Sequence, residues 1–179
     1  RLCAEAARDV SSEELASNWL RQLLEISGAD FLVLRMLSPD GTHLEEIANA
    51  PDISISVSPL ELNCADLIES RAVSSRQDQW FDGGTKFNQD DPLSRLGAAV
   101  SGVAHPLEMG GEMIGVLTLG VCNDHWEPMA RDINVVRSLG DFLGTLLHSL
   151  RRRDEANHSR LIKRELQIAA DIQRSLLPA

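Results

Sequence analysis

The sequence predicts an α+β fold, in which a central antiparallel sheet has helices on both faces and a long C-terminal coiled-coil linker helix follows. Three observations support this prediction. Apolar runs typical of buried strands occur in two pairs, and glycine-bearing turns join the members of each pair. A helical apolar pattern precedes the first pair. Helix-forming residues dominate the chain after Pro128, where about 48 residues contain no proline.

The first helix is predicted to begin near Ser11 or Ser12 and to end at Gly28. Either serine can cap the helix, and Glu14 stands near its third position, as in a capping box. Glycine commonly follows the last helical residue. Apolar side chains recur at helical spacing and predict one buried face, made of Leu15, Trp19, Leu23 and Ile26.

Two hairpins are predicted to form the sheet. The apolar run 31–37 is followed by the turn sequence "SPDG" and a returning strand, "HLEEIA". The stretch "LGAAVSGVAHPLEMGGEMIGVLTLG" contains two further strands around "EMGGE", whose glycines permit the positive φ of a tight turn. Between the hairpins we expect a short helix in "SPLELNCADLIESRA", a short strand in "AVSSRQ", a polar loop from Asp78 and a short helix in "DPLSRLG".

The C-terminal helix is predicted over residues 127–177. Its leucines alternate spacings of four and three, which is typical of a coiled coil. A polar stretch from Arg151 interrupts this pattern, and the apolar pattern returns in a different register. The expected dimer seam consists of Leu139, Leu143, Leu146, Leu150, Leu161, Ile168, Ile172 and Leu176. The alternative is that the first half packs on its own domain and the second half is surface.

Composition excludes several classes of function. The net charge is −10, and the first 150 residues carry 10 basic and 23 acidic residues, which argues against nucleic-acid binding. No run of about 18 apolar residues indicates a membrane span. Three widely spaced cysteines do not suggest a disulfide framework. Cys122 and His125 have a ligand-like spacing, but no second pair is visible, so no metal site is expected.

The segments "GADFLVLRMLSPDGTHL" and "LGAAVSGVAHPLEMGGEMIGVLTLG" resemble the GAF domain, a small-molecule sensing module. The resemblance implies a GAF-like sensory domain over residues 1–150. It also implies that any ligand pocket lies between the sheet and residues 62–95. The candidate pocket residues are Trp80, Phe81, Phe87 and His105. Two interpretations stay open, because the aromatic side chains would either close a ligand cleft or fill the space themselves.

The C-terminal "ELQIAADIQRSLLP" resembles the segment that precedes the catalytic domain of bacterial metal-dependent serine/threonine phosphatases of partner-switching pathways. The resemblance implies that residues 151–177 are a linker to a phosphatase domain beyond Ala179. Such a domain would use Mn or Mg and would dephosphorylate an anti-anti-sigma-like protein. No catalysis and no cofactor are expected within residues 1–179.

The working hypothesis is a cytoplasmic, homodimeric regulatory fragment of a signalling phosphatase. A small ligand or a regulatory protein would act on the sensory domain and change the helix pairing that positions the phosphatase domain. The alternative is a constitutive dimerisation scaffold that binds no ligand.

Overall fold

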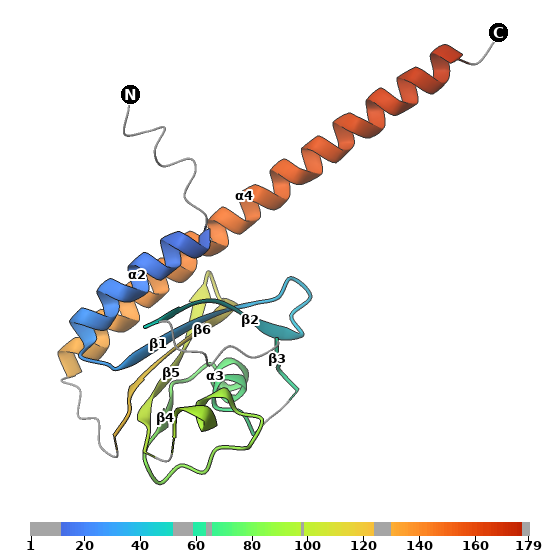
Figure 1. Ribbon diagram of the computed structural model, residues 1–179. Coiled ribbons are helices and arrows are strands. Elements are labelled where there is room, and N and C mark those ends of the chain that lie inside the picture. The colour runs from blue at the N-terminus through green and yellow to red at the C-terminus, as the bar shows by residue number, and fades with distance from the viewer. Residues whose placement is uncertain (1–11, 52–58, 64–65, 98, 124–129, 177–179) are drawn as a thin grey trace, which may run out of the picture. The chain divides into compact units, whose positions relative to one another are not determined.

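The computed structural model describes residues 12–51, 59–63, 66–97, 99–123 and 130–176, and the chain divides into two units, 1–145 and 146–179 (Figure 1). The first unit contains one sheet, made of β1 (Phe31–Leu37), β2 (His43–Ala50), β3 (Leu60–Glu61), β4 (Gln79–Phe81), β5 (Ser101–Met109) and β6 (Glu112–Val121). Its order is β3-β2-β1-β6-β5-β4, and every neighbouring pair is antiparallel. The predicted α+β architecture with an antiparallel sheet is therefore confirmed.

Both predicted hairpins form. The first turn follows β1, where the Asp40 carboxylate accepts hydrogen bonds from Ser38 Oγ at 2.6 Å and from the backbone N–H of Thr42 at 3.1 Å. These hydrogen bonds lower the pKa of Asp40 to about 2. In the second turn, Gly110 and Gly111 have φ of 61° and 87°, which a side chain would disfavour.

Helices cover the two faces of the sheet: α2 (Ser12–Ser27) and the first part of α4 (Ala130–Leu176) on one, and α3 (Ile68–Ser75) and the 3-10 helix η1 (Pro92–Leu96) on the other (Figure 1). Gly140 lets α4 approach the sheet closely, because a Cβ there would lie 2.7 Å from Leu117 Cδ2. The rings of Trp19 and Phe142 join α2 to α4, with centroids 5.8 Å apart.

The α3 face holds a continuous apolar core. Its members come from the sheet, from α3 and from the segment before β5, and they include Phe31, Val33, Leu44, Ile68, Ala72, Phe81, Leu93 and Ala104. Two glycines of the sheet allow aromatic rings to approach the strands closely. A Cβ on Gly102 would lie 2.6 Å from Phe81 Cζ, and a Cβ on Gly120 would lie 2.9 Å from Phe31 Cζ.

The buried face of α2 is shifted by about one residue from the predicted face, because Ala16 and Leu20 are buried in place of Leu15 and Trp19. Ile26 is 52% exposed, and Leu15 and Trp19 are half-buried. Leu23 is buried as expected, and Ala16 and Leu20 complete the contact with the sheet. Two predictions between the hairpins were also wrong. "AVSS" belongs to α3 rather than to a strand, and the expected polar loop begins with β4.

The C-terminal helix is observed over Ala130–Leu176. Leu143 is fully buried in the structure, whereas Leu139, Leu146 and Leu150 are half-buried. The side chains of Leu161, Ile168, Ile172 and Leu176 lie outside the described residues. A coiled-coil pairing of this helix stays a prediction, and the complete burial of Leu143 supports the alternative in which the first half packs on its own domain.

Candidate functional site

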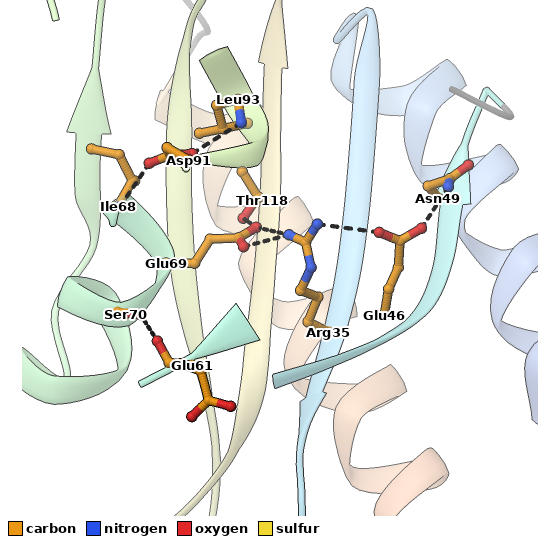
Figure 2. A network of polar contacts seen from close by, with 10 residues as sticks. All are labelled: Arg35, Glu46, Asn49, Glu61, Ile68, Glu69, Ser70, Asp91, Leu93 and Thr118. Atoms are coloured by element: carbon orange, nitrogen blue, oxygen red, sulfur yellow. Dashed lines mark hydrogen bonds and ion pairs between the residues drawn. The ribbon is translucent and has the colours of Figure 1, made fainter. Parts of the chain in front are cut away.

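The α3 face contains a buried polar network centred on Arg35 (Figure 2). The Arg35 guanidinium is paired on one side with the Glu69 carboxylate of α3 and on the other with Glu46 Oε2 of β2, at 3.1 Å. Thr118 Oγ1 donates to Glu69 Oε1 at 2.6 Å, and Asn49 Nδ2 donates to Glu46 Oε1 at 2.7 Å. Arg35 and Glu69 are only 3% and 2% exposed, so each depends on its partner for solvation.

A β-bulge places Glu46 in this network. The pairing between β1 and β2 changes register after Leu34. Leu34 lies opposite Ala48, but the next residue of β1, Arg35, lies opposite Glu46. Ile47 is therefore an extra residue in β2. Without the bulge, strand alternation would give Glu46 and Ala48 the same face. The bulge turns Glu46 towards α3 and leaves Ala48 on the other side.

Asp91 holds the beginning of α3. Its carboxylate accepts hydrogen bonds from the backbone N–H of Ile68 at 3.1 Å and from that of Leu93 at 2.9 Å (Figure 2). It thus joins the first turn of α3 to η1. Asp91 is 2% exposed, and this burial raises the pKa of its carboxyl group, although both hydrogen bonds act in the opposite direction.

A cleft lies beside this junction, between α3 and the loop that follows β4. Its volume is about 480 Å³, within the usual range for small-ligand sites. Arg71 and Lys86 line it with the side chains of Asp66, Ile68, Thr85, Phe87 and Asn88. Both cations are exposed, and Phe87 is half-buried.

The structure separates the four predicted pocket residues. Phe81 is 4% exposed and belongs to the core, where its ring meets that of Phe87 edge to face at 5.7 Å. Phe87 also lines the cleft. Trp80 is 53% exposed. His105 lies on the α4 face of the sheet. The four residues therefore do not line one cavity, and Phe81 fills space as one of the two interpretations expected.

His105 belongs to a second polar cluster, which joins the sheet to α4. His105 Nδ1 lies 2.7 Å from Asp78 Oδ1, and His105 Nε2 lies 3.5 Å from Asp141 Oδ1 on α4. Arg137, also on α4, forms an ion pair with Asp78. These contacts connect α4 to β5 and to Asp78, the residue immediately before β4.

No group of three or more His, Cys, Asp or Glu side chains in the described part of the chain could hold a metal ion. Burial and the neighbouring Asp30 raise the pKa of the exposed Cys122 thiol, which disfavours the reactive thiolate. Cys64 and His125 lie outside the described residues. The arrangement on the α3 face is suited to binding and to holding α3 in place.

Comparison with known families agrees with this architecture. The model of the GAF domain matches residues 11–147. The chain belongs to the GAF domain family. GAF domains are signal-sensing regulatory domains of sensor kinases and similar proteins, so the sensory class that the resemblance to this family implied is confirmed. No curated relative matches the chain.

Solved structures share the fold at low sequence identity. The GAF domain of a two-component sensor histidine kinase from Bacillus halodurans has a TM-score of 0.67 and 16% identity, covering 81% of this chain and 99% of that one. The GAF domain/HD domain protein from Geobacter sulfurreducens has a TM-score of 0.64 and 12% identity, with coverages of 79% and 95%. The free methionine-R-sulfoxide reductase from Neisseria meningitidis has a TM-score of 0.61 and 14% identity, with coverages of 84% and 86%.

In the described part of the chain, no helix has both the length and the apolar character needed to cross a membrane.

Sequence reasoning missed the charged residues of the α3 face. Arg35 is the one charged residue in the run "FLVLRML", and a cation inside a buried strand requires an anionic partner. That signal was available, but it does not identify the partner. Glu69 lies 34 positions away, on a helix that was expected within residues 58–72 and is observed over Ile68–Ser75.

Proposed function

We propose that this chain is the regulatory and dimerisation part of a cytoplasmic bacterial signalling phosphatase. One combination of features carries the proposal. A GAF domain continues into a 47-residue helix, and the end of that helix carries the phosphatase-linker pattern "ELQIAADIQRSLL". The phosphatase domain would use Mn or Mg and would act on a phosphorylated anti-anti-sigma-like protein. The GAF domain would supply the signal, and the helix would transmit it.

The proposed route of the signal passes through the sheet. The Arg35–Glu69 pair fixes α3 to one face, and the His105–Asp78–Arg137 cluster fixes α4 to the other. A ligand or protein that moves α3 would alter the strands on which α4 rests. The effector must bind the two arrangements with different affinities, because otherwise it shifts no equilibrium.

Homodimerisation would use the apolar side of α4 that the sheet does not cover. Phe142 is 54% exposed and Val135 is 37% exposed, and both share a helical face with Leu139. A shallow hollow of about 540 Å³ lies beside Val135 and Leu139. Leu143 faces the domain's own interior, so its substitution would test folding rather than pairing.

Light scattering tests the dimer. We expect residues 1–179 to be dimeric at micromolar concentration, and we expect Val135→Glu to weaken the dimer by at least tenfold, because it buries an unpaired charge in the interface. Gln89→Glu is the matched control, since it adds a carboxylate on an exposed loop. A wild-type chain that stays monomeric at high micromolar concentration contradicts the proposal.

The phosphatase link is tested in the natural full-length protein. Its Mn-dependent hydrolysis of a phosphoserine protein substrate should change in Val135→Glu but not in Gln89→Glu. Absence of any phosphatase activity from the full-length protein would refute the assignment. A ligand-free dimerisation scaffold is the second candidate, favoured by the way Phe81 and the Arg35 network fill the α3 face. A scaffold predicts a dimer that no small molecule affects.

A further inference from the structure

We propose that the cleft between α3 and the loop after β4 binds a small organic anion that carries a carboxylate or phosphate group. The proposal deepens the proposed sensory function and rests on it, because it names the class of ligand that the GAF domain would sense. The cleft has a volume of about 480 Å³ and combines polar donors with the apolar side chains of Ile68 and Phe87.

The charge of the cleft is opposite to that of the domain around it. Arg71 and Lys86 line the cleft with one carboxylate, that of Asp66, whereas the chain as a whole carries a net charge of −10. Among the described residues, neither Arg71 nor Lys86 takes part in an ion pair. Two cations without an ion-pair partner among the described residues, at one cleft of an acidic protein, favour an anionic ligand.

Among the described residues, the neighbouring acidic groups form no ion pair with these cations. The Asp82 carboxylate accepts hydrogen bonds from the N–H of Gly84 and from the Thr85 hydroxyl, so it is engaged by its own turn. Asp91 is buried, and its carboxylate accepts the backbone N–H groups of Ile68 and Leu93. Arg71 interacts with Asp91 only through its long-range charge.

The hydrogen-bonding groups of the lining are mostly free donors. Asn88 Oδ1 accepts from the backbone N–H of Asp90 at 3.3 Å, which leaves the Asn88 amide NH₂ for a ligand. The guanidinium of Arg71 and the ammonium of Lys86 are donors only. A carboxylate or a phosphate presents acceptors to such a set, and guanidinium groups bind both in a bidentate manner. Phe87 offers a surface for the organic part of the ligand.

The cleft is joined to the interior network through α3. Arg71 and Glu69 are two residues apart on this helix. Arg71 lines the cleft, while Glu69 is paired with Arg35 of β1 beneath the helix. An anion held by Arg71 therefore acts on the same turn of helix that the network fixes to the sheet.

Isothermal titration calorimetry with phenyl phosphate tests the assignment, at constant ionic strength and with benzyl alcohol as the uncharged probe. We expect saturable binding of phenyl phosphate, with amide NMR shifts confined to residues 66–71 and 85–88. Arg71→Gln and Lys86→Gln should each weaken binding by about tenfold or more, because each removes a charge-assisted hydrogen bond. Arg21→Gln is the control, since it removes one exposed cation from α2.

Three results would overturn the anion site: no saturable binding up to about 10 mM phenyl phosphate, equal affinity in Arg71→Gln and the wild type, or equal binding of benzyl alcohol. Because Arg71 and Lys86 are exposed, both variants should fold, which circular dichroism checks. Light scattering of the same samples separates the two proposals. A dimer that binds no probe refutes only the anion site, whereas a monomer that binds phenyl phosphate refutes the dimeric regulator.

Discussion

Replacing Arg35 with methionine should be among the most damaging substitutions in the domain. The change preserves most of the side-chain volume but leaves Glu69, which is 2% exposed, without its cation. Glu46, which is 13% exposed, loses the same partner. Removing one member of a buried ion pair typically costs about 3–5 kcal/mol in the free energy of unfolding. We expect Arg35→Met to fall in this range, because two carboxylates are left rather than one.

A double-mutant cycle distinguishes the ion pair from simple packing. Adding Glu69→Gln to Arg35→Met should restore more than half of the lost stability, since a neutral pair carries a much smaller desolvation penalty. Urea denaturation at fixed protein concentration measures each free energy of unfolding. Arg76→Met is the matched control, because Arg76 is 55% exposed, lies 3.8 Å from Glu108 and donates an exposed hydrogen bond to the Gly111 carbonyl. Loss of these exposed contacts predicts an effect of about 0–1 kcal/mol. A cost below about 1 kcal/mol for Arg35→Met, or strictly additive effects in the double mutant, would refute the reasoning.

Three further predictions concern local features. The pKa of Asp40 is lowered to about 2, so the stabilising contribution of its carboxylate is present above the unfolded pKa and is lost as the pH falls through about 2. Calorimetry should therefore find Asp40→Asn less stable than wild type at about pH 6, and the difference should vanish near pH 2. The pKa of Asp91 is raised by burial, so its contribution is greatest below the unfolded pKa and falls as the pH rises through the folded value. The stability advantage of wild type over Asp91→Asn, measured in urea, should therefore shrink with rising pH, and a growing advantage would contradict the assignment. Gly102→Ala should cost about 1–3 kcal/mol, because its Cβ would lie 2.2 Å from the carbonyl oxygen of Leu119, whereas the exposed Gly84→Ala should be nearly neutral in thermal melts.

The sequence was sufficient for the two hairpins, because strand and turn signals are local, but not for the short edge strands β3 and β4, which lie in a predicted helix and a predicted loop. Apolar runs and the turns at residues 38–41 and 110–111 fixed both hairpins, and Gly28 marked the end of α2. The pairing of charged groups was not predictable, because it depends on contacts between residues far apart in the chain. A one-residue bulge at Ile47 decides which face Glu46 occupies, and no periodicity shows it.

The heptad pattern of α4 was ambiguous for a related reason. A leucine spaced for a coiled coil is spaced equally well for burial against a sheet, and the sequence does not say which neighbour is nearer. Gly140 and Gly144 show which side of the first half of α4 packs on the sheet, and pairing through the opposite side stays a prediction. A Cβ at Gly140 would meet Leu117, and one at Gly144 would meet Leu107, so this side of the helix is the one that approaches the sheet. Leu143 belongs to it.

Strand β5 contributes side chains both to the core under α3 and to the polar cluster on the α4 face. Ala104 belongs to the core under α3, while the next residue, His105, reaches Asp78 and Asp141 on the α4 side. Alternation along a strand makes this inevitable, because successive side chains point to opposite faces. A close-packed sheet transmits displacement only when both layers have a second arrangement available. The buried Arg35–Glu69 pair holds α3 against one face of the sheet, and the Asp78–Arg137 pair holds α4 against the other, so displacement of either helix would have to break an ion pair.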